Sequence, residues 1–175
     1  MKNVFLSFVK QNQEANKTIA GIFEKLSNDD REKDRKSFYK SLSGLFCHNT
    51  GAAVYFLNLM KDAVPGNVAA QKAVKPLEKI QDLKGKLSEE QWKQAASFTK
   101  TADKALVDFV TALEDNDFQA PVKIDWYKGK PPTVPLWFML EQHISHNIHH
   151  RGQISQILDS LKIDNDYSGI NVKFL

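Results

Sequence analysis

The chain has 175 residues, of which 42% are hydrophobic and 26% charged, a balance typical of one globular domain with a core of its own. Its formal net charge of +3 comes from 24 basic and 21 acidic residues spread along the sequence, with no basic stripe between aromatic residues, so we expect no nucleic-acid partner. No run approaches the ~20 apolar residues that a membrane-spanning helix needs, so we expect no membrane partner.

The first predicted element is a helix from about Val4 to Leu26. Apolar residues recur there at near-helical spacing, and no proline or glycine cluster interrupts them. The apolar stretch that precedes this helix is too short for a signal peptide, and no small-residue cleavage site follows it. The polar, charged residues 27–36 are predicted to form a loop.

The second predicted helix runs from about Ser37 to Asp62 and ends before the helix-stopping pair Pro65 and Gly66. It contains the chain's single cysteine, Cys47, which is more typical of a small buried thiol than of a catalytic group. One cysteine excludes an intramolecular disulfide, which fits a reducing compartment. We therefore expect a cytoplasmic protein.

The next segment, residues 67–83, has a weaker helical pattern that Pro76 interrupts, so it is either a short helix or a connection. The third long helix is predicted from Ser88 to about Leu113. Ser88 and Gln91 have the spacing of a capping box, in which the two side chains satisfy free backbone donors reciprocally.

Three of the six prolines lie between Asp115 and Thr133, where a short alternation of apolar and polar residues predicts a hairpin or an extended loop. The fourth helix is predicted to start with Thr133 as its N-cap and Pro135 in its first turn, and to run to about Lys162. The tail, residues 163–175, is expected to be irregular and partly docked.

These elements predict an all-α protein in which residues 1–175 form a single domain. Its architecture would be a four-helix bundle with a short hairpin-like insertion before the last helix. Four-helix bundles build metal sites from side chains on facing helices.

All five histidines fall on two of the predicted helices: His48 on the second, and His143, His146, His149 and His150 on the fourth. Residues four apart on a helix lie about 40° apart and one turn along the axis, so His146 and His150 are the best pair to share a metal ion. The pair His143 and His146 is second choice. His143 and His150 are separated by roughly 10 Å along the axis, and His149 lies at the edge of the face.

Two histidines make a weak site, and His48 supplies a third ligand because it lies on the inward face of the second helix. A lone histidine there would usually be a core or boundary residue, and the cluster on the fourth helix could also be a polar, solvated face. Three histidines from two facing helices would instead make an open metal site. Nitrogen ligands suit zinc, nickel, copper or ferrous iron.

The run HNIHHRGQ at residues 146–153 resembles the signature near the last helix of the DinB-like superfamily. The preceding residues 135–140, the segment 37–48 and Asn16 also resemble that family. The resemblance implies an up-down-down-up bundle that holds a divalent metal ion, often nickel or zinc, through His48, His146 and His150. It also implies a homodimer, and a small-molecule substrate that reacts with or without a low-molecular-weight thiol.

The leading functional hypothesis is therefore a metal-dependent thiol transferase or hydrolase that acts on a small molecule. Its catalytic residues beyond the metal ligands are unknown, since the nearest acidic residues, Glu141 and Asp159, do not lie on the histidine face. The first alternative is a non-catalytic metal-binding or stress-related helical protein, in which the metal is structural or regulatory. The second is a helical interaction module without a metal.

Overall fold

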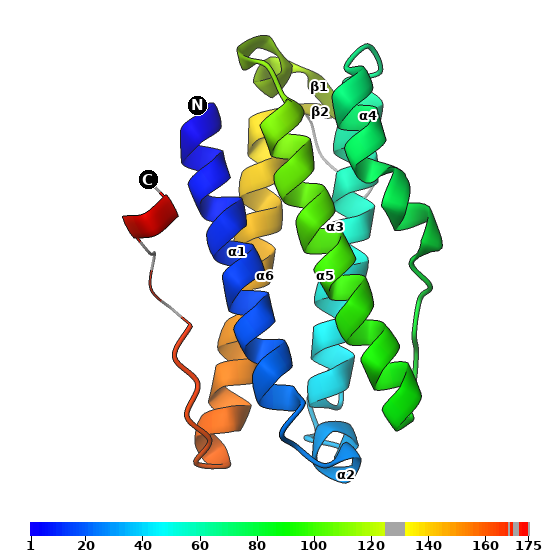
Figure 1. Cartoon of the computed structure of the whole chain (residues 1–175), viewed down its shortest axis with the longest axis vertical. Coiled ribbons are helices and arrows are strands. Elements are labelled where there is room, and N and C mark those ends of the chain that lie inside the picture. The colour runs from blue at the N-terminus through cyan, green and yellow to red at the C-terminus, as the bar shows by residue number, and fades with distance from the viewer. Residues whose placement is uncertain (125–131, 168, 170–171, 175) are drawn as a thin grey trace.

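The computed structural model describes residues 1–124, 132–167, 169 and 172–174. Four long helices form the bundle: α1 (Lys2–Phe23), α3 (Leu42–Ala63), α5 (Glu89–Ala112) and α6 (Leu136–Ser160). In Figure 1, α1 and α6 run in one direction and α3 and α5 run in the other, which is the expected up-down-down-up order. The all-α four-helix prediction is confirmed.

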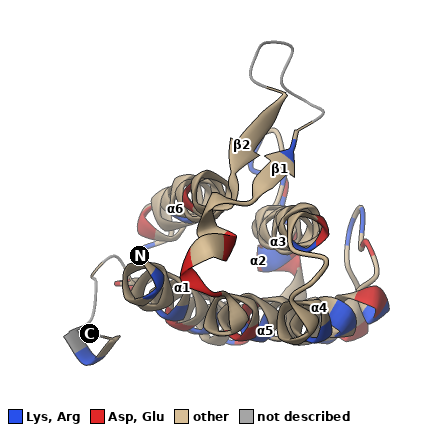
Figure 2. Cartoon of the chain, turned by 90° about the horizontal axis from the view of Figure 1, so that it is seen from above, with Lys and Arg blue, Asp and Glu red and all other residues tan. Residues whose placement is uncertain are grey.

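Each long helix packs against two others, because α1 contacts α5 and α6, and α3 also contacts α5 and α6. Seen from above, α3 and α6 lie side by side, opposite a row formed by α1, α5 and the short α4 (Val68–Val74) (Figure 2). The facing pair of α3 and α6 carries all five histidines.

The parallel arrangement of α3 and α5 requires a connection that returns along the bundle. This connection consists of α4, the 3-10 turn η1 (Lys75–Lys79) and the extended residues 80–88. Both alternatives for residues 67–83 are thus partly realised, as a short helix and as a connection. The predicted capping box of Ser88 and Gln91 is confirmed at the start of α5, where the connection ends.

The hairpin-like insertion is present as two short antiparallel strands, β1 (Pro121–Lys123) and β2 (Thr133–Pro135), after the 3-10 turn η2 (Asp115–Gln119). The remainder of the predicted hairpin, residues 125–131, lies outside the described residues. The strands lie over the α3 and α6 end of the bundle in Figure 2.

The predicted start of the fourth helix at Thr133 is wrong. Thr133 pairs with Lys123 in the strand ladder, and the backbone N–H of Leu136 donates to the carbonyl of Ala120. The pairing keeps the chain extended as far as Pro135, so the helix begins at Leu136 with Pro135 as its N-cap.

Two other predictions about the ends of elements also need correction. Residues 27–36 are not entirely a loop, because Ser27 caps a short helix, α2 (Asn28–Glu32), by accepting a hydrogen bond from the backbone of Asp30. The second long helix starts at Leu42, where Ser41 accepts from the backbone N–H of Gly44, and not at Ser37.

The core consists of two apolar clusters with buried polar side chains between them along the bundle. One cluster gathers around α4, β1 and the adjacent ends of the long helices, and the other contains the mutually packed rings of Phe23, Phe46 and Trp92. The polar set between them belongs to all four long helices: Asn12, Asn16, Asn49, Thr50, Thr99, Asp103, His143, Asn147 and Arg151.

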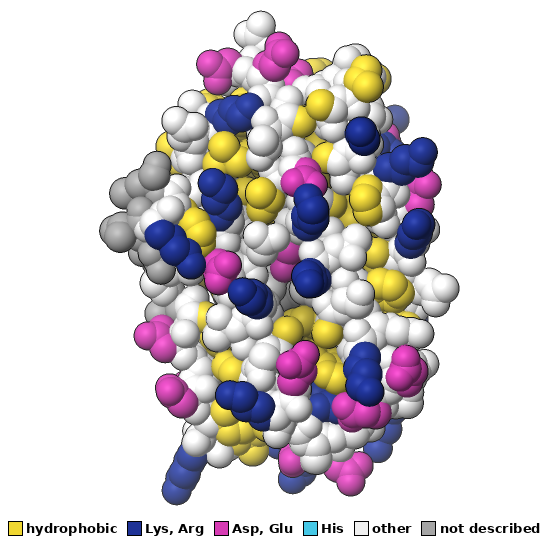
Figure 3. All heavy atoms as spheres, viewed as in Figure 1, with side chains coloured by type: hydrophobic (Ala, Val, Ile, Leu, Met, Phe, Trp, Pro, Cys, Tyr) yellow, Lys and Arg dark blue, Asp and Glu magenta, His cyan; other side chains and the backbone are white. Residues whose placement is uncertain are grey.

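On the face shown in Figure 3, lysine and arginine side chains alternate with acidic ones, and no histidine is visible there. Residues 163–167 after α6 are irregular and dock through Tyr167, whose hydroxyl accepts from Ser155 and donates to the carbonyl of Arg151. Residues Val172–Phe174 form a short 3-10 turn, η3, that contacts α1. No helix in the described part of the chain is long and apolar enough to cross a membrane.

Candidate metal centre

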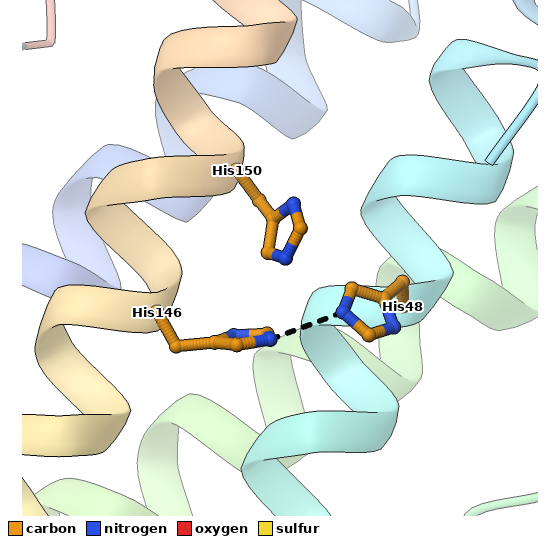
Figure 4. Close-up of side chains that lie close together, drawn as sticks. All are labelled: His48, His146 and His150. Carbon is orange, nitrogen blue, oxygen red and sulfur yellow. Dashed lines mark hydrogen bonds between the residues drawn. The ribbon is translucent and has the colours of Figure 1, made fainter. Parts of the chain in front are cut away.

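Three of the five histidines converge between α3 and α6. His48 extends from α3 toward His146 and His150, which lie one turn apart on α6 (Figure 4). Each residue offers a ring nitrogen, and these three nitrogens all lie within 4.8 Å of one another. The Nε2 atoms of His48 and His146 are 3.0 Å apart, and the ring centroids of His146 and His150 are 4.4 Å apart. We call these three residues the histidine triad.

The donor atoms of the triad fit a divalent metal ion. Nitrogens bound about 2.0–2.1 Å from one tetrahedral ion lie about 3.3 Å from each other, close to the observed His48–His146 separation. His150 donates its Nδ1–H to Oε1 of Gln153 over 2.7 Å, which leaves its Nε2 lone pair free. Nε2 of His146 faces the triad, since it lies next to Nε2 of His48, and Nδ1 of His146 is buried without a hydrogen-bond partner among the described residues.

The triad is uncharged at neutral pH. Burial, and to a smaller extent the neighbouring His150, lower the pKa of His48 to about 4. The pKa of His146 is likewise lowered to about 4, first by burial and then by His150, His48 and His149. Burial also lowers the pKa of His150. Neutral imidazole is the form that ligates metals, so the site is already in its binding state at pH 7.

The other two histidines lie outside the triad. His143 is fully buried, its ring lies 5.6 Å from that of Phe56, and the Asn147 side chain hydrogen-bonds to the His143 carbonyl. His149 is exposed, and its ring packs beside His150 at a centroid distance of 4.8 Å. The structure therefore brings together the ring nitrogens of the three histidines selected from the sequence, while the other two histidines are not part of that group.

Comparison with known protein families agrees with this geometry. The model of the DinB family matches residues 1–161. The chain belongs to the DinB family. That family is associated with metals, and the triad of this DinB-family chain could hold one. No curated protein matches the chain.

One residue beside the triad had no predicted role. The ring of Tyr39 stacks on that of His48 with centroids 4.1 Å apart, and its hydroxyl lies 2.9 Å from Nε2 of His48. Burial raises the pKa of this phenol, which keeps its proton in place. Helical periodicity could not reveal this contact, because Tyr39 lies before α3 in a turn that the sequence assigned to the helix.

The turn that carries Tyr39 has specific backbone requirements. Lys36 and Lys40 adopt positive φ angles of 57° and 63°, which reverse the chain on either side of it. The chain then passes so close to α3 that a Cβ on Gly44 would lie 2.2 Å from the Tyr39 carbonyl oxygen. Glycine at position 44 therefore permits the approach that places the Tyr39 ring against His48.

The sole cysteine of the DinB-family chain precedes His48 but does not join the triad. Burial, and to a smaller extent the carboxylates of Glu32 and Asp82, raise the pKa of Cys47 to about 12. A thiol with that pKa is protonated at neutral pH and is a poor nucleophile. Cys47 is only half-buried and lines a surface hollow, so it differs from the small buried thiol that the sequence predicted.

A surface hollow of about 860 Å³ adjoins the triad. His48 and His146 both contribute to its wall, so a molecule inside it lies next to the candidate metal position. The rest of the wall comes from Tyr39, from α3, from residues 80–87 and from α5.

Proposed function

We propose that this DinB-family protein binds one divalent metal ion, nickel or zinc, through His48, His146 and His150, and uses it in thiol transfer or hydrolysis on a small molecule. The observation that carries the proposal is the convergence of three neutral ring nitrogens from two facing helices beside an open hollow. Three protein ligands leave a coordination position for water or substrate, which is typical of catalytic sites.

A divalent ion at the triad would supply Lewis acidity and lower the pKa of a thiol or water so that its anion exists at neutral pH. The chain's own residues prepare the site. Gln153 fixes the tautomer of His150. Tyr39 presents a protonated hydroxyl at the edge of the triad, where it hydrogen-bonds to Nε2 of His48. A metal ion on that nitrogen would release the hydroxyl to hydrogen-bond a substrate. The walls of the hollow orient that substrate toward His48 and His146.

The position of Tyr39 also supports the alternative function, in which the metal is structural or regulatory. A structural metal site is closed by a fourth protein ligand. The Tyr39 oxygen, 2.9 Å from Nε2 of His48, is the nearest candidate. Under this alternative, Tyr39→Phe opens the site and weakens metal binding strongly. Under the catalytic proposal, the same variant retains its metal.

The first experiment measures metal content by mass spectrometry after nickel or zinc loading and dialysis. We expect one ion per chain in the unmodified protein, and less than a tenth of that in His48→Ala and His146→Ala. His149→Ala is the matched control, because it removes an exposed histidine from the same cluster and should leave metal content unchanged. Full metal content in His48→Ala would contradict the three-ligand site.

The second experiment tests catalysis in the metal-loaded protein. Glutathione with 1-chloro-2,4-dinitrobenzene reports thiol transfer, and 4-nitrophenyl acetate reports hydrolysis. We expect turnover of at least one of these pairs that disappears in His146→Ala and persists in His149→Ala. Equal rates in the two variants would rule out a role for the triad in turnover.

The remaining parts of the proposal concern the whole protein. We propose that residues 1–175 form one domain, that the protein is cytoplasmic, and that it assembles as a homodimer. Support for the location comes from the single cysteine, which excludes an intramolecular disulfide. Light scattering after size-exclusion chromatography tests the dimer, and a single thermal transition tests the one domain.

A further inference from the structure

Besides Tyr39 and His146, three parts of the chain line the hollow beside the triad. One wall is the face of α3 that carries Cys47, Gly51 and Val54, and the wall opposite it is the extended segment 80–87. Ala95 and Phe98 of α5 also line the hollow. Its volume of about 860 Å³ lies within the range of small-molecule sites, roughly 300–1,000 Å³.

The charged side chains that line the hollow pair with each other and extend into solvent. Among the described lining residues, full charges belong to Asp82 and Lys84, which pair with each other at 2.8 Å. Their side chains are 72% and 82% exposed, so they extend into solvent. The hydroxyl of Thr50 is also engaged, with the Phe46 carbonyl and with Thr99. A charged ligand would therefore find no unpaired counter-charge on the described wall.

Gly51 lines the hollow and is exposed to solvent. It lies in the interior of α3, where glycine is unfavourable, and neither a positive φ nor close packing requires it. A Cβ built on it meets nothing within 4 Å. The missing side chain leaves space on the wall one turn after His48, which is the space that a ligand would occupy.

We propose that this hollow binds the body of an uncharged, mainly apolar small molecule and that Gly51 is a specificity-determining residue. The proposal deepens the proposed function and rests on it for one part, the delivery of the ligand's reactive polar group to the metal at the triad. The apolar, open wall and the paired charges select against acidic and basic molecules. His48 and His146 then provide the polar end of the site.

The test uses the uncharged dye 6-propionyl-2-dimethylaminonaphthalene, whose fluorescence shifts in apolar surroundings. We expect saturable binding of one dye per chain, at least tenfold weaker binding in Gly51→Leu, and at least tenfold weaker binding of the anionic dye 8-anilinonaphthalene-1-sulfonate. The control is Gly21→Leu, because Gly21 is also a helical glycine with nothing within 4 Å of an added Cβ, but it lies on α1. Unchanged dye binding in Gly51→Leu would overturn the proposal, as would equal binding of the two dyes.

A second variant and a metal-free measurement keep the test independent of folding and of the metal. Val54→Trp fills the same hollow from the next turn of α3 and should weaken dye binding as Gly51→Leu does. Circular dichroism shows whether each variant is folded. Dye binding should persist within twofold after removal of metal with a chelator. If the unmodified protein binds dye but no metal, the proposed metal-dependent function is wrong and the proposal that the hollow binds an apolar ligand is supported. If it binds metal but no dye, only the proposal about the hollow is wrong.

Discussion

At the scale of single residues, Gln153 decides which nitrogen of His150 is free for a metal ion. Its Oε1 accepts the Nδ1–H of His150 over 2.7 Å, and such a partner fixes both the tautomer and the orientation of a ligand ring. Gln153→Leu removes the acceptor and should lower zinc affinity by about 10- to 100-fold. Gln153→Glu keeps an acceptor oxygen and should retain the affinity. Competition with a chromophoric chelator measures both variants, and an affinity of Gln153→Leu within twofold of the unmodified protein would refute this role.

The sequence predicted which three histidines form the triad, but it did not predict the residues that contact them. Helical spacing placed His146 and His150 on one face and His48 on the inward side of another helix, because both helices are long and regular. Spacing says nothing about a turn, so the stacking of Tyr39 on His48 was not predictable. Gln153 lay on the correct face, but its hydrogen bond depends on a rotamer that sequence does not specify.

At the scale of elements, the start of α5 was predictable because its signal is local. Ser88 accepts from the backbone N–H of Gln91, and the Gln91 side chain accepts from the backbone N–H of Ser88. Ser88→Ala removes one half of this capping box and should lower the free energy of unfolding by about 1 kcal/mol. Urea denaturation measures the change. Ser97→Ala, an exposed serine inside the same helix, is the control and should cost nothing, so equal losses would indicate that the cap does not contribute.

The starts of α3 and α6 were predicted less well, because each depends on contacts with distant residues. The turn before α3 packs its backbone against Gly44, so the helix begins only after Ser41, which caps it. The chain before α6 is held extended by its pairing with β1. A serine or threonine ahead of an apolar run is therefore a reliable cap only where no neighbouring segment binds the same backbone.

At the scale of the whole molecule, a buried polar network connects three helices. Asp103 of α5 accepts from Asn16 and Asn12 of α1 over 2.9 and 3.2 Å, and Arg151 of α6 donates to Asn12. Each helix contributes an apolar pattern that is visible in the sequence. The polar partners, however, lie 87 to 139 positions apart in the chain, so single-sequence patterns cannot pair them. The division of the core into two apolar clusters was not predictable for the same reason.

This network predicts a pH dependence of stability. Burial raises the pKa of Asp103 to about 7, against the opposing effects of the Asn16 hydrogen bond, Arg151 and the Asn12 hydrogen bond. An unfolded aspartate has a pKa of about 3.9, so between about pH 4 and pH 7 only the folded chain holds this proton. The stability that Asp103 contributes is therefore complete below pH 4 and is lost as the pH rises to 7.

Asp103→Asn removes that proton but keeps the carbonyl oxygen. The free energy of unfolding of the unmodified protein, minus that of Asp103→Asn, should fall on the order of 1 kcal/mol per pH unit from pH 5 to pH 7 and then level off. Urea denaturation of the metal-free proteins at pH 5, 6, 7 and 8 measures this difference, because the histidines are common to both and cancel. Parallel profiles would show that Asp103 stays ionised.

A metal ion at the triad should stabilise the whole bundle, because folding brings His48 next to His146 although 98 positions separate them in the chain. At a free metal concentration 100 times the dissociation constant, binding adds about 2.7 kcal/mol to the free energy of unfolding. For a chain of this length, that corresponds to a rise of about 5–10 °C in the melting temperature. Thermal denaturation followed by circular dichroism should show this rise with zinc or nickel in the unmodified protein and in His149→Ala. His48→Ala should show none, since only two neighbouring ligands on α6 remain and these lie close together in the unfolded chain as well. An equal rise in His48→Ala would mean that the metal binds elsewhere in the protein.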